Sequence, residues 1–379
     1  MQNAETPGKA IRERERLLGV DFWRGLALLT IFINHIPGNV FERFTHRNFG
    51  FSDATETFVM LAGVAAALAY LPRFARGKAL PATFRILQRV FQLYMVHIFL
   101  IIVCGAIIAQ AVARTGDFRL FEAVHLDILI NDTIPGLIGL AGLGLQPAYL
   151  NILPLYIVLL LMAPALFVLA RTSLPLMLAA SAGLYVASQL LWLSLPTFPM
   201  EGNWFFNPLC WQFLFAIGIA IGALILRGEK PRRSAVLFWG SVAYIAVSAV
   251  WVVFAFWPTW DLPLPRFIWE FDKTNLFLPR LLHALALTYV VAYLPVEKWL
   301  GGNEFARPFV MLGRHSLPVF CLGTILAIWA QVVRAEASHG LGLDIILISG
   351  GILAQFALAG VLEWYRSGAS VSAARSQRA

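Results

Sequence analysis

Long apolar segments recur through this chain of 379 residues and constrain its fold more than any other feature. A helix needs about 20 apolar residues to cross the hydrocarbon core of a bilayer. Apolar residues make up 59% of the chain and charged residues 13%, which is too little charge to cover a soluble surface of this size. We therefore expect an all-α polytopic membrane protein with about ten transmembrane helices, and exclude a soluble enzyme, a disordered protein and a coiled coil. The candidate spans are about 19–37, 54–71, 89–112, 149–169, 174–195, 208–226, 234–256, 277–295, 314–333 and 343–364.

The basic residues predict the orientation of these spans. With both termini placed in the cytoplasm, 20 of the 29 Lys and Arg residues fall in inside segments and 7 in outside segments. Cytoplasmic loops of membrane proteins carry such an excess, so we expect both termini to be cytoplasmic. The same bias explains the net charge of +8 without a nucleic-acid partner. We expect a single transmembrane domain over 17–365, between polar cytoplasmic tails at 1–16 and 366–379.

Ionisable residues cluster in the first span, where charge is costly and marks candidate functional sites. Arg24 and His35 are eleven residues apart, which is three helical turns plus 20°, so they lie on one helix face about 16 Å apart along the axis. Asp21 can pair with Arg24 from one turn before it. Asn34 precedes His35 on the outer side. A helix that faces the bundle interior with satisfied polar groups is the structural alternative.

Two carboxylates begin the second span, in Ser52-Asp53-Ala54-Thr55-Glu56. Asp53 or Ser52 can cap this helix, with Glu56 at the third helical position. Glu56 can also orient His35 or share a proton with it. Both roles stay open for Asp53 and Glu56.

Basic side chains at the predicted inner face suit an anionic cytoplasmic ligand. Arg85 and Arg89 are spaced one turn apart, and Arg314 and His315 begin the ninth span. These groups can hold the phosphates of a nucleotide-like donor. Arg85 and Arg89 can equally snorkel to lipid phosphates.

The predicted outer face carries Arg280 and His283, one turn apart, and several aromatic residues. A buried Arg280 suits a substrate carboxylate or an acidic partner. The outer aromatic residues indicate either an interfacial belt or a stacking platform for sugar rings. The substrate-binding candidates are Arg280, His283, Asp21, Asn34, Trp204 and Trp211.

Together these groups favour acyl transfer across a membrane. His35 suits proton abstraction from a hydroxyl, because the pKa of histidine lies near neutral. The chain has no phosphate-binding Gly-x-x-x-x-Gly-Lys-Ser/Thr loop, no Gly-x-Ser-x-Gly elbow and no His-Glu-x-x-His helix. We expect neither a metal nor a resident cofactor.

Longer stretches carry a family resemblance. Arg24 and His35, with ten residues between them, resemble the arginine-x10-histidine signature of the acyltransferase-3 superfamily. The surrounding sequence resembles the OpgC family, the succinyltransferases of osmoregulated periplasmic glucans. The similar stretches are Asp21-Phe22-Trp23-Arg24-Gly25-Leu26-Ala27, Asn34-His35-Ile36-Pro37-Gly38-Asn39, Phe49-Gly50-Phe51-Ser52-Asp53-Ala54-Thr55-Glu56-Thr57-Phe58, Asn207-Pro208-Leu209-Cys210-Trp211-Gln212-Phe213 and Leu312-Gly313-Arg314-His315-Ser316-Leu317.

The resemblance implies a ten-helix bacterial inner-membrane enzyme that takes succinyl from cytoplasmic succinyl-coenzyme A to a periplasmic glucan. It implies that His35 is the catalytic base and that Arg24 belongs to the essential core. The alternatives are another acyl donor or glycan acceptor, a proton-coupled secondary transporter, or a protein that binds or modifies lipid.

Overall fold

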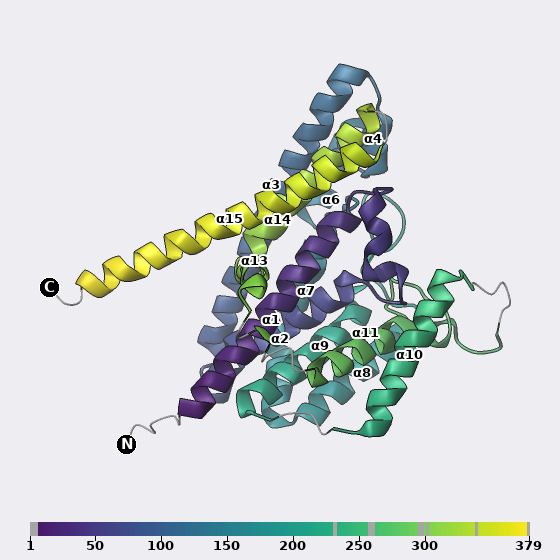
Figure 1. The fold of residues 1–379 in the computed structure, drawn as a ribbon. Coiled ribbons are helices and arrows are strands. Elements are labelled where there is room, and N and C mark those ends of the chain that lie inside the picture. Colours follow the sequence, from purple (N-terminus) through teal and green to yellow (C-terminus); the bar gives the residue numbers. More distant parts are fainter. Residues whose placement is uncertain are drawn as a thin grey trace. The chain divides into compact units, whose positions relative to one another are not determined.

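The computed structural model describes residues 7–229, 233–256, 262–294, 299–300, 303–337 and 340–376, with side chains from 18 to 367 (Figure 1). Over these residues the chain is helical, without a named strand. The α-helices are α1 Pro7–Asn34, α2 Ala54–Ala75, α3 Ala79–Thr115, α4 Arg119–Ala123, α5 Ile128–Asn131, α6 Thr133–Ala141, α7 Ile152–Thr172, α8 Leu174–Leu190, α9 Pro208–Arg227, α10 Ala235–Val253, α11 Leu278–Tyr293, α13 Arg307–Arg314, α14 Ser316–Glu336 and α15 Leu341–Ser376. Short 3-10 helices are η1 Val40–Phe44, η2 His46–Asn48, η3 Arg266–Ile268 and η4 Glu304–Ala306.

A helix occupies each of the ten expected spans, which confirms the all-α membrane fold. Among the described residues, seven helices are long and apolar enough to cross a bilayer: α2, α3, α7, α9, α10, α14 and α15. Helices α8 and α11 are apolar but shorter. Helix α1 carries Asp21 and Arg24 within its predicted span.

Several helix boundaries differ from the expected ones. Helix α3 begins at Ala79, so Arg85 and Arg89 lie two to three turns inside a helix of 37 residues rather than at its start. The ninth span is preceded by the short helix α13, and Arg314 and His315 lie at the break before α14. Helix α15 continues to Ser376 and α1 begins at Pro7, so the backbone is helical within both polar tails.

The contacts divide the chain into two compact units. The central unit, His46–Leu294, contains α2 to α11. The terminal unit joins Met1–Thr45 to Pro295–Ala379 and contains α1 and α13 to α15.

Glycines bring α2 and α9 together in the central unit. A Cβ on Gly63 would overlap the carbonyl oxygen of Phe215, and a Cβ on Gly218 would overlap that of Met60. Small residues at such positions let helix backbones approach closely, which is a usual means of helix association in membranes. This contact fixes the start of α2, where Asp53 and Glu56 lie.

The terminal unit uses the same device between α1 and α13. A Cβ on Gly25 would overlap the carbonyl oxygen of Phe309, and a Cβ on Gly313 would overlap that of Asp21. The polar residues of α1 are therefore held directly against the segment that precedes α14.

We predict that Gly218→Ala lowers the free energy of unfolding by about 1–3 kcal/mol, because the new methyl group meets backbone rather than a flexible side chain. The measurement is the melting temperature in detergent. Gly183→Ala in α8 is the matched control, since a Cβ there meets nothing within 4 Å. Equal melting temperatures for the two variants would contradict the close packing of α2 on α9.

Candidate functional site

His35 lies on the turn that ends α1. The helix closes at Asn34, and the His35 N–H still donates to Ile31 O at 2.9 Å, so His35 keeps the helical register with Arg24. Gln331 of α14 donates from Nε2 to the carbonyl oxygen of His35 at 2.6 Å. The backbone of the proposed base is therefore held by a neighbouring helix.

A buried ion pair fixes the residues that follow His35. Arg334 of α14 pairs with Asp344 of α15, and the two side chains are 9% and 4% exposed. Arg334 also donates to Gly38 O at 3.0 Å, and Asp344 accepts from the Val40 N–H at 2.9 Å. Asn34, expected near the substrate, accepts a hydrogen bond from the Thr45 hydroxyl at 2.8 Å.

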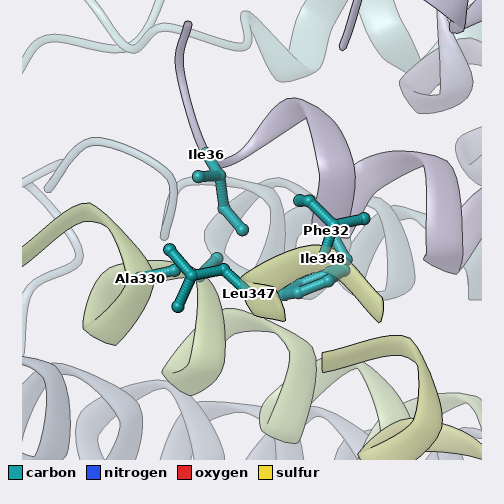
Figure 2. Packing of buried hydrophobic residues seen from close by; sticks show 6 residues of the cluster. Phe32, Ile36, Ala330, Leu347 and Ile348 are labelled. Atoms are coloured by element: carbon teal, nitrogen blue, oxygen red, sulfur yellow. The ribbon is translucent and has the colours of Figure 1, made fainter. Parts of the chain in front are cut away.

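Apolar packing supports the same turn. Phe32 and Ile36, on either side of His35 in sequence, lie together with Ala330, Leu347 and Ile348 in one buried cluster (Figure 2). His35 itself is half-buried. The turn is thus anchored from α14 and α15 while the imidazole keeps some exposure.

A charged cluster forms at the other end of the terminal unit. Asp21 lies 3.9 Å from Arg24, as expected, and 3.7 Å from Arg314. Glu363 of α15 lies 3.1 Å from Arg314 and 2.9 Å from His315 Nε2. Glu363 lies near the end of the last span and is not among the site residues predicted from the sequence. Arg314 and His315 thus already have carboxylate partners within the chain.

The second helix begins with the expected capping box. Asp53 Oδ1 accepts from the Thr55 N–H at 2.8 Å, and Glu56 Oε2 accepts from the Asp53 N–H at 2.8 Å. Two backbone donors at the start of α2 are thereby satisfied. Asp53 and Glu56 belong to the central unit, whereas His35 belongs to the terminal unit.

Arg280 joins both carboxylates into an ion-pair network. Its Nε donates to Glu56 Oε1 at 2.8 Å, and its terminal nitrogen lies 3.4 Å from Asp53 Oδ2. Lys273 Nζ contacts the same Asp53 oxygen at 2.5 Å. The sequence predicts either a substrate carboxylate or an acidic residue as the partner of Arg280. In the structure its partners are acidic residues of the same chain. Glu56 is fully buried and the Arg280 side chain is 13% exposed. Because little water reaches these charges, each is stabilised by the opposite charge beside it.

Lys273 is not among the site residues predicted from the sequence, and its position depends on α9. Trp211 donates from Nε1 to the carbonyl oxygens of Lys273 and Thr274 at 3.2 and 3.1 Å. Trp211 is fully buried and Trp204 is 4% exposed. Both rings pack inside the protein, so neither presents a face to a soluble acceptor in this structure, whereas the sequence predicts Trp204 and Trp211 as substrate contacts.

His283 is also buried and contacts Ser52, the residue before Asp53. The Ser52 N–H donates to His283 Nδ1 at 3.3 Å, and Ser52 Oγ lies 2.7 Å from the same nitrogen. A Cβ on Gly50 would overlap the imidazole ring, so glycine is required there. His283 thus fixes the segment that leads into α2.

An open groove of about 1000 Å³ lies along α2 and α3. It brings Arg85 and Arg89 together with Arg73, which the sequence analysis had not selected. Arg89 also donates to Gln92 Oε1 at 2.7 Å. Tyr70 lines the groove beside these cations. Its size and charge fit a large anionic ligand.

No group of three or more His, Cys, Asp or Glu side chains could hold a metal ion in the part of the chain that the structure describes. Three cysteines, Cys104, Cys210 and Cys321, are free thiols in the structure.

The ion pairs of Asp53 predict how the stability of the protein depends on pH. Burial by itself raises the pKa of this carboxyl, but Lys273 and Arg280 lower it by more, so the pKa lies well below its ordinary value. A carboxyl with a lowered pKa stabilises the fold above its unfolded pKa of about 3.9, and this contribution is lost as the pH falls further. We predict that Asp53→Asn lowers stability by about 3 kcal/mol near neutral pH, because it unbalances a buried ion pair.

The measurement is the melting temperature of wild type and variant in detergent across pH. The difference in melting temperature between wild type and Asp53→Asn should be constant above about pH 5 and shrink below about pH 4. Asp117→Asn is the control, because Asp117 pairs only at the surface with Arg119, whose side chain is 85% exposed. A difference that grows in acid would contradict the assignment.

Comparison with known proteins identifies the family. Residues 16–367 match the family described as OpgC protein, which covers most of the chain and includes every candidate residue above. No curated protein and no solved structure gives a match. The family implies an acyltransferase with an acyl donor and a glucan acceptor in general terms. The chain belongs to the OpgC family.

Proposed function

We propose that this protein is a transmembrane O-acyltransferase that moves succinyl from cytoplasmic succinyl-coenzyme A to a hydroxyl of a periplasmic glucan. The family match over residues 16–367 carries this proposal. Succinyl-coenzyme A acts as a co-substrate, with no resident cofactor. The protein would lie in the bacterial inner membrane with its acceptor side in the periplasm, in agreement with the bias of basic residues.

The donor's phosphates would bind in the groove of the central unit. Arg73, Arg85 and Arg89 supply three guanidinium groups there, and Tyr70 lies beside them for a purine ring. Arg314 and His315 were also candidates for these phosphates. Because Asp21 and Glu363 already balance them, we assign Arg314 and His315 to the packing of α1, α14 and α15 instead.

His35 would act as the general base. Its imidazole takes the proton from an acceptor hydroxyl, and the oxygen attacks the thioester carbonyl. The new C–O bond forms, the C–S bond breaks, and the coenzyme A thiolate receives the proton from His35. The hydrogen bond from Gln331 and the Arg334–Asp344 pair would keep this histidine in place.

Arg24 and a nearby backbone amide are the two candidates to steady the oxyanion that would form beside His35. Helix α1 is continuous from Arg24 to Asn34, so Arg24 and His35 stay about 16 Å apart along the axis. A backbone amide near His35 is therefore a better candidate than Arg24 to steady the oxyanion. Asp53 and Glu56 would hold Arg280 and the start of α2.

We predict that His35→Ala abolishes succinyl transfer and leaves the fold intact, because Gln331 bonds the backbone of His35 and not its side chain. The assay follows thiol release together with the mass of the glucan, for purified protein in nanodiscs with succinyl-coenzyme A. His125→Ala, at an exposed position, is the control and should retain full activity. Near-normal turnover in His35→Ala would overturn the base assignment.

We further predict that Arg85→Ala and Arg89→Ala each raise the KM for succinyl-coenzyme A by about ten- to a hundredfold, with little change in the KM for glucan. Each loses one charge-assisted hydrogen bond to phosphate, worth about 1.5–3 kcal/mol. Arg171→Ala, an exposed residue in the last turn of α7, serves as the matched control. If the arginines only contact lipid, all three variants will keep the donor KM of the wild type.

A further inference from the structure

Five buried nitrogen atoms of the central unit have no hydrogen-bond partner among the described residues. Two belong to His97 in α3, and the other three are His46 Nε2, Trp251 Nε1 and His283 Nε2. These three come from η2, α10 and α11. A buried donor without a partner is energetically costly, so native proteins contain few of them. Several such atoms in one region suggest that a polar partner is missing.

The proton on His283 can be placed from its contacts. The Ser52 backbone N–H can only donate, so His283 Nδ1 must accept. In the neutral imidazole the proton then lies on Nε2. His283 is 2% exposed, so its Nε2–H is a buried hydrogen-bond donor. Trp251 Nε1–H is a second donor, because an indole nitrogen cannot accept.

Phe51 connects these groups into one aromatic cluster. Its ring centroid lies 6.0 Å from His283, 6.3 Å from Trp251 and 4.4 Å from Phe271. Tyr244 lies 6.3 Å from His283. The turn that begins with His46 packs against α10.

The cluster reaches the protein surface. Tyr244, Trp251 and Phe271 are each only partly buried. An apolar site with a few convergent polar groups is the usual composition of a small-molecule site. Aromatic faces suit the C–H faces of a pyranose ring, and N–H donors suit its hydroxyl oxygens. Because the nitrogens are covered in this structure, an occupant must displace a partly buried ring.

We infer that the aromatic cluster of Phe51, Tyr244, Trp251 and Phe271, with the ring nitrogens of His46 and His283, binds one pyranose unit of the glycan acceptor. This inference rests on the proposed function, which supplies a glucan acceptor on the outer side. Trp251 lies near the end of α10 and His283 near the start of α11, on the side that the charge bias assigns to the outside, and Tyr244 lies midway along α10. The cluster replaces Trp204 and Trp211 as the aromatic contact with sugar.

The test measures binding of a linear glucose oligosaccharide to the full chain in nanodiscs, by calorimetry and without donor. Trp251→Phe keeps an aromatic ring and removes one N–H, so it should weaken binding about tenfold. His46→Ala should also weaken binding. Trp239→Phe on the same helix is the matched control, because Trp239 is 67% exposed and lies outside the cluster. It should bind like the wild type.

Transfer kinetics add a second readout. Trp251→Phe should raise the KM for the oligosaccharide about tenfold and leave the KM for succinyl-coenzyme A unchanged. If Trp251→Phe and His46→Ala bind the oligosaccharide as tightly as the wild type does, the proposed subsite is wrong and buried water satisfies the nitrogens. The proposed function would still stand in that case. If the wild type neither binds the oligosaccharide nor modifies it, both fail.

Discussion

The cost of charge in a low-dielectric membrane governs this structure. Each buried charged group found in the helices has an opposite charge beside it: Glu56 with Arg280, and Asp344 with Arg334. Removing one partner of such a pair leaves an uncompensated charge, which is much more costly than replacing both. The pairs therefore fix which helices lie together. Arg280 of α11 is tied to the start of α2, and Arg334 of α14 is tied to α15 and to the turn after His35.

The same pairs separate residues that act as scaffold from residues that remain available for chemistry. Arg314, His315 and Arg280 all looked like ligand groups in the sequence, and all three have carboxylate partners in the chain. The groove of Arg73, Arg85 and Arg89 is different, because it is open and rich in cations. For this reason the proposal assigns the anionic donor to the groove.

Close helix contacts then position the site. Gly63 and Gly218 allow α2 to lie against α9, and α9 in turn carries Trp211, which holds the backbone of Lys273. Because Trp211 holds the Lys273 backbone, the glycine contact between α2 and α9 also positions the lysine that pairs with Asp53. In the terminal unit, Gly25 and Gly313 place α1 against α13 in the same way.

The sequence alone determined the all-α membrane class, the ten helical segments, the capping box of Asp53 and Glu56, and the pairing of Asp21 with Arg24. These depend on composition, or on residues within one helical turn, so local spacing is sufficient. Helix packing was needed to show that Arg280 meets Glu56, 224 residues away, and that Lys273, Glu363 and the Arg334–Asp344 pair take part in ion pairs. It also decided that Trp204 and Trp211 are buried. The physical reason is that ion pairing and burial depend on which helices pack together, and helical periodicity in a uniformly apolar segment does not specify its neighbours.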